Sequence, residues 1–175
     1  MKSLMRLPWF LLIVLVLGTF ISTPARAGEW LKKLDAQGQE LPDEATNWNM
    51  VLDSRVGLYW EVKTLDDSIH ANSATYTYAE VKEAFIARLN GDKFGGFADW
   101  RLPTSSELKS LRLKKTESAE ANIDLRYFPN TQPAKYMAEG PCTSHPGYRE
   151  ESIKFGKNTT KGGSYVQAVR GASQP

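Results

Sequence analysis

The chain has 175 residues, and its 22 Lys and Arg against 20 Asp and Glu give a formal net charge of +2. Because proteins that coat DNA or RNA carry a large basic excess, this near-balance argues against nucleic acid as a partner. With 41% hydrophobic and 24% charged residues, 13 Gly and 9 Pro, the composition is that of a globular domain. It excludes collagenous and wholly disordered chains.

The first 27 residues are predicted to be a secretory signal peptide. Lys2 and Arg6 precede an apolar stretch over residues 7–21, and Ala25-Arg26-Ala27 is a small-x-small cleavage site. The apolar stretch is shorter than the ~20 residues that a spanning helix needs, so we expect cleavage before Gly28 and no transmembrane anchor afterwards. The mature protein is therefore expected in the periplasm, outside the cell or on its surface.

Residues 28–47 are polar and interrupted by Gly38 and Pro42, which predicts a loosely packed N-terminal arm. Residues 48–175 are then expected to form a single domain. At its start, large apolar residues recur at every second position on both sides of a turn-rich stretch over residues 53–57, which predicts a β-hairpin. The alternating residues are Trp48, Met50 and Leu52 on one side of the turn and Leu58, Trp60 and Val62 on the other.

Two helices are predicted from capping boxes, in which a Thr hydroxyl and a Glu three residues later satisfy exposed amide donors. The first box pairs Thr77 with Glu80, and this helix is expected to end at Asn90–Gly91. Its buried face is Val81, Phe85 and Leu89. The second box pairs Thr104 with Glu107, and this helix is expected to end near Lys115, with Leu108 and Leu111 buried.

A closing hairpin is predicted near the C-terminus. Ile153 and Phe155 alternate with polar residues, Tyr165, Gln167 and Val169 form a second alternating stretch, and residues 157–163 between them are turn-like. With the first hairpin and the two helices, this order predicts an α+β fold.

Four segments in order resemble the bacterial DUF1566 family, also called the Lcl C-terminal domain family. The central one is GGFADWRLPTSSELKSL at residues 95–111; the others are VLDSRVGLYW at 51–60, YTYAEVKEAFIARLN at 76–90 and AVRG at 168–171. The sequence departs from the family pattern in two places. Val56 stands where Thr is usual, and Tyr136 is followed by Met137, Ala138 and Glu139 instead of a Tyr-Trp-Ser-Ser stretch.

The resemblance implies a C-type-lectin-like fold related to sulfatase-modifying factors, with a twisted, mostly antiparallel sheet, two helices and long loops. It also implies an exported bacterial module that binds ligands or mediates adhesion. Within the central motif, packing and capping explain each residue. Trp100 and Leu102 are expected to be buried, Pro103 to precede the capped helix, and Asp99 and Arg101 to pair with backbone or with one another.

No catalytic set or cofactor site is predicted. Formylglycine-generating enzymes, which share an RLPT-like helix start, use two cysteines, whereas this chain has only Cys142, so that activity is a distant alternative. Cys142 with His145 is the one candidate nucleophile–base or metal pair, and it lies in a Pro- and Gly-rich loop. His70 and His145 are too few for a zinc site, and Asp66 with Asp67 is expected to be a solvated turn, not a calcium site.

Charge is the feature that points to a partner. Residues 28–99 hold 13 acidic and 7 basic side chains, whereas residues 100–175 hold 7 acidic and 12 basic ones. The candidate ligand-binding residues are the cations gathered in the basic half: Arg112, Lys114, Lys115, Lys154, Lys157 and Lys161. Helix-dipole complementarity and protection of strand edges are the alternative explanations for these cations.

Two functions therefore stay open. The first is a non-catalytic binding or adhesion module for a polyanionic glycan or another cell-envelope component, which a basic groove would favour. The second is a structural accessory subunit that packs against a protein partner, which an exposed aromatic patch would favour.

Overall fold

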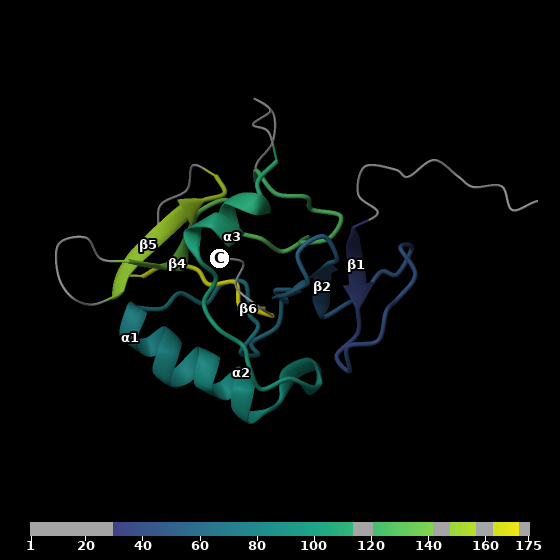
Figure 1. The fold of residues 1–175 in the computed structure, drawn as a ribbon, viewed down its shortest axis with the longest axis horizontal. Helices are drawn as coiled ribbons and strands as arrows, with labels where there is room; N and C mark the ends of the chain where they lie inside the picture. Colours follow the sequence, from purple (N-terminus) through teal and green to yellow (C-terminus); the bar gives the residue numbers. More distant parts are fainter. Residues whose placement is uncertain (1–29, 114–120, 142–147, 157–162, 172–175) are drawn as a thin grey trace, which may run out of the picture.

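The structure, a computed structural model, describes residues 30–113, 121–141, 148–156 and 163–171 (Figure 1). A sheet of four strands and a separate two-stranded sheet combine with a long helix and a short one, which confirms the α+β class. The main sheet has the order β1-β2-β3-β6, and every neighbouring pair in it is antiparallel. Its strands are β1 (Leu31–Leu34), β2 (Met50–Asp53), β3 (Leu58–Glu61) and β6 (Val169–Arg170).

The first predicted hairpin is confirmed as β2 and β3. Val51 lies opposite Trp60, and the turn between the strands contains Gly57 with a φ of 67°. Because positive φ is costly for residues with a Cβ, Gly is the residue suited to this turn.

The prediction of a loosely packed arm is wrong for residues 31–34, near its start. Residues 31–34 form β1, which pairs with β2 along its whole length, and Leu34 is buried. The backbone of residues 31–34 forms its hydrogen bonds with residues 50–53, which the polar composition of the arm did not indicate. Since this pairing is decided by a distant segment, local composition did not reveal it.

The second sheet corrects the predicted closing hairpin. Its strands are β4 (Lys135–Pro141) and β5 (Tyr148–Lys154), so Ile153 lies opposite Tyr136. The segment around Tyr165 instead lies on the other edge of β4, where the Met137 amide donates to the Tyr165 carbonyl at 2.8 Å. β4 therefore separates the two stretches that were expected to pair, because alternation identifies a strand but not its partner.

Both capping boxes are confirmed. α1 (Tyr78–Glu80) continues through a π-helical stretch, η1 (Val81–Ile86), into α2 (Ala87–Gly91), and the three form one helix at the lower left of Figure 1. The second helix, α3 (Ser105–Ser110), ends earlier than the expected Lys115. It stops because Arg112 forms a bridge with Ile123 and the Leu113 amide donates to the Asn122 carbonyl. Among the described residues, no helix is long and apolar enough to cross a membrane.

The central motif connects these elements. As expected, Trp100 and Leu102 are buried. Asp99 and Arg101 do not pair with one another. Asp99 accepts from Arg170 at the end of the main sheet, whereas the Arg101 guanidinium binds Glu107 of α3 and the backbone carbonyl of Leu102.

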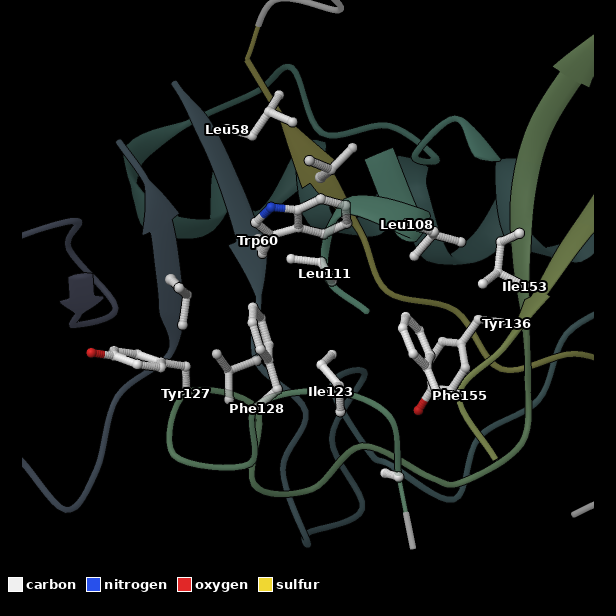
Figure 2. Close-up of a cluster of buried hydrophobic side chains, with 14 of the residues drawn as sticks. Leu58, Trp60, Leu108, Leu111, Ile123, Tyr127, Phe128, Tyr136, Ile153 and Phe155 are labelled. Atoms are coloured by element: carbon white, nitrogen blue, oxygen red, sulfur yellow. The ribbon is translucent and has the colours of Figure 1, made fainter. Parts of the chain in front are cut away.

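Two groups of buried side chains cover opposite faces of β3. Trp60 is at the centre of the first group, between Leu58 and Leu111 and above the side chains from residues 123–128 (Figure 2). The second group lies under the long helix and includes Phe85 and Leu89, with Tyr59 packed against it. Both faces of β3 are therefore covered. As a result, Glu61 at the end of β3 and Lys63 just after it are buried.

Gly171 of the AVRG segment approaches the hairpin turn closely. A Cβ built on Gly171, which has a φ of +107°, would lie 2.5 Å from the Gly57 carbonyl oxygen, whereas at Gly96, with a φ of +82°, it would meet nothing within 4 Å. We expect Gly171→Ala to lower the free energy of unfolding by about 1–3 kcal/mol more than Gly96→Ala, because only the first adds a clash to the backbone strain. Urea unfolding of both variants measures the difference, and equal losses would contradict it.

Candidate functional site

A hollow of about 340 Å³ is lined by three arginines and an apolar wall. It lies where the start of β1, the turn after β2, the C-terminal end of α3 and the segment 124–128 meet. Its lining residues are Trp30, Leu31, Arg55, Ser110, Leu111, Arg112, Leu113, Asp124, Arg126 and Phe128. A concave surface with a few convergent charged groups is the usual form of a binding site.

Two of the arginines make the same set of hydrogen bonds with an aspartate two residues earlier in the chain. The Arg55 backbone amide donates to Asp53 Oδ1 at 3.1 Å, while its Nε and Nη2 donate to Oδ1 and Oδ2 at 3.0 and 2.6 Å. Arg126 binds Asp124 in the same way, with the corresponding distances 3.1, 3.0 and 2.6 Å. We call this arrangement the Asp-x-Arg clamp.

The clamps orient the two guanidinium groups. Hydrogen bonds with their aspartates raise the pKa of Arg55 and of Arg126, and the bond with Arg126 lowers the pKa of Asp124. Each guanidinium also lies over an aromatic ring, Arg55 at 4.6 Å from the centre of Trp30 and Arg126 at 5.8 Å from that of Tyr127. Such contacts restrict the rotamers of an otherwise flexible side chain.

The third arginine, Arg112, is exposed and forms no ion pair with any residue that the structure describes. Its backbone is fixed by the bridge with Ile123. Asp53 and Asp124 balance two of the three cations, so Arg112 gives the hollow an excess of one positive charge.

Of the six predicted ligand-binding residues, Arg112 and Lys154 lie in the described part of the chain, and both are exposed. Of these two, Arg112 lines the hollow and Lys154 does not. Lys154 is in β5, and the segment 122–123 lies between the two, since Asn122 donates to the Phe155 carbonyl and accepts from Leu113. Lys114, Lys115, Lys157 and Lys161 lie outside the described residues, as do Cys142 and His145.

Arg55 and Arg126 were not predicted. Each follows an aspartate two residues earlier, so in the sequence it looks like one half of a neutral surface pair. The available signal was the repeated spacing, Asp53-Ser54-Arg55 and Asp124-Leu125-Arg126, although the chain path that brings the two repeats to one hollow is tertiary.

A buried charged network lies apart from the hollow. Glu61 Oε1 accepts from Lys63 Nζ at 2.9 Å and contacts His70 Nδ1 at 2.8 Å, and Glu61 Oε2 accepts from the Ala168 amide at 3.1 Å. Glu61 is fully buried and Lys63 nearly so, and burial lowers the pKa of Lys63. Glu61 and Lys63 alternate with Trp60 and Val62 along the chain, so they lie on the opposite face, which the long helix covers.

Two other polar features of the described residues have partners within the chain. A second hollow of about 320 Å³ is lined in part by Lys63, whose ammonium group is bound to Glu61. In the predicted turn, hydrogen bonds from Ser68 and Thr64 lower the pKa of Asp66 to about 2. Within the part of the chain that is described, no group of three or more His, Cys, Asp or Glu side chains could hold a metal ion.

Comparison with known proteins gives one match. Residues 49–172 match the family model of the Lcl C-terminal domain. No curated protein and no solved structure matches the chain, so the C-type-lectin-like part of the predicted fold stays a prediction.

Proposed function

Since the chain belongs to the Lcl C-terminal domain family, we propose that it is an exported, non-catalytic binding module for a polyanionic glycan or another anionic component of the cell envelope. The family match covers most of the chain, and export rests on the predicted signal peptide. The absence of catalysis rests on the single cysteine and on the lack of a recognisable nucleophile, base and orienting group in the sequence.

One observation carries the proposal. Arg112, selected from the sequence because it lies in the basic half, lines a hollow together with two other arginines. Arginine suits this role because its planar guanidinium grips carboxylate or sulfate with two parallel hydrogen bonds. Lys154, the other candidate that the structure describes, is exposed in β5 and does not line the hollow.

We expect Arg112→Gln to weaken the binding of a sulfated polysaccharide roughly fivefold, equivalent to about 1 kcal/mol, at about 0.1 M salt. Arg88→Gln is the matched control, since Arg88 is an exposed arginine paired with Asp92 in the long helix. It removes the same charge outside the hollow and should change the affinity little. Isothermal titration calorimetry of the purified protein at two salt concentrations measures both variants.

The same titration tests the alternative, an accessory subunit for a protein partner. Leu113 at the hollow and nearby Leu125 are 51% and 45% exposed, and such a partner would have to cover them. Binding that is indifferent to salt, or equal in the Arg112 and Arg88 variants, would contradict the polyanion proposal and favour this alternative.

A further inference from the structure

We propose that the two Asp-x-Arg clamps preorganise Arg55 and Arg126, so that the hollow recognises a single monoanionic group, a carboxylate or sulfate ester, on one sugar residue. This inference rests on the proposed function and deepens it. It assigns binding to two arginines outside the predicted cationic set and a positioning role to the two aspartates.

The first argument is the geometry of the clamps. Each aspartate is bound side-on, through Nε and Nη2 of its arginine. A guanidinium has five N–H donors, so this leaves the end-on edge, made by one N–H of Nη1 and one of Nη2. No described residue pairs with that edge in Arg55 or Arg126. Each arginine thus retains a two-pronged donor edge while its side chain is already ordered.

The second argument is charge and shape. The three arginines and their two aspartates sum to one positive charge, and Asp43, which accepts from Tyr127 beside Arg126, reduces the local excess further. A single monoanionic group therefore suits the hollow better than a dense run of charges. Beside the arginines lie the partly exposed Leu31 and the exposed Leu113, an apolar wall suited to the C–H face of a sugar ring, with Leu111 and Phe128 buried behind it. A volume of about 340 Å³ is at the small end of ligand pockets, consistent with one residue of a glycan.

The third argument concerns the direction in which the loss of the Asp124 charge changes anion binding. If the hollow attracts anions by net charge alone, removing the charge of Asp124 should strengthen binding. If Asp124 positions Arg126, the same change should weaken binding, because the freed side chain must be ordered when the ligand binds. The two explanations therefore predict opposite effects of one substitution.

The experiment is calorimetric titration of the full chain with glucuronate, with glucose 6-sulfate and with neutral glucose. We expect the anionic sugars to bind and glucose not to, and Asp124→Asn to weaken anion binding roughly three- to tenfold, the cost of ordering one long side chain. Asn keeps an oxygen that accepts from the Arg126 amide, so the turn should survive. Asp92→Asn is the matched control, since it frees Arg88 in the long helix, and it should not weaken binding.

Arg126→Lys provides a second, independent variant. It keeps the charge but loses the two-pronged edge, so we expect a similar loss of affinity with unchanged thermal unfolding. The ratio between the two anionic sugars identifies the group that the hollow prefers. Equal or tighter binding by the Asp124→Asn variant, or no binding of either anionic sugar by the wild type, overturns this inference. Binding of a sulfated polysaccharide that depends on Arg112 would in that case still support the proposed function.

Discussion

Lys63→Met should lower the free energy of unfolding by about 3–5 kcal/mol, because it removes the ammonium group that balances the buried Glu61 carboxylate and leaves His70 as the remaining side-chain partner among the described residues. Glu61 is fully buried between the main sheet and the long helix, and Lys63 supplies one of its few hydrogen bonds. The ammonium group of Lys63 also lies 4.4 Å from the centre of the Phe85 ring, so its apolar surroundings suit Met. The loss should therefore come from the stranded charge and not from poor packing.

The double variant Glu61→Gln with Lys63→Met separates these causes. Replacing both partners removes the buried charge while Gln still accepts hydrogen bonds, so the double variant should recover at least half of the single loss. Lys32→Met is the matched control, since Lys32 pairs with Glu40 on the surface and its loss should cost less than about 1 kcal/mol. Urea unfolding measures all three variants. A loss below about 1 kcal/mol for Lys63→Met would show that the pair is not a buried charge network.

Trp60→Ala should cost about 3–5 kcal/mol, the range for truncating a large buried aromatic side chain. Trp60 is fully buried in β3 and lies between Leu58 and Leu111, at the point where the main sheet meets α3 (Figure 2). Truncation would leave a cavity that the sheet and helix, both fixed by hydrogen bonds, cannot close.

Trp60→Phe is the informative comparison. The indole Nε1 is buried and has no hydrogen-bond partner among the described residues, so Phe loses volume but no hydrogen bond. We expect its cost to be less than half that of Trp60→Ala, measured by urea unfolding with a circular-dichroism signal. A cost equal to that of the Ala variant would show that the indole nitrogen has a polar role.

Part of the candidate site could be read from the chain. Arg112 stood out as a cation in a basic half, and it is the predicted residue that lines the hollow. Arg55 and Arg126 did not stand out, because their aspartates neutralise them locally and they are 71 residues apart in the numbering. Only the fold brings both clamps beside Arg112, so sequence indicated the sign of the charge but not the arrangement of the site.

What the sequence alone determined was local. The two capping boxes, the β2–β3 hairpin and the burial of Trp100 and Leu102 depend on residues close together in the chain, and all are confirmed. Tertiary structure decided which segments pair with one another. It added β1 to the sheet, placed β4 between the segments expected to pair, and ended α3 early through the bridge of Arg112 with Ile123. The same distinction applies to the buried Glu61 and Lys63, because the alternating pattern of a strand cannot show that a distant helix covers its second face.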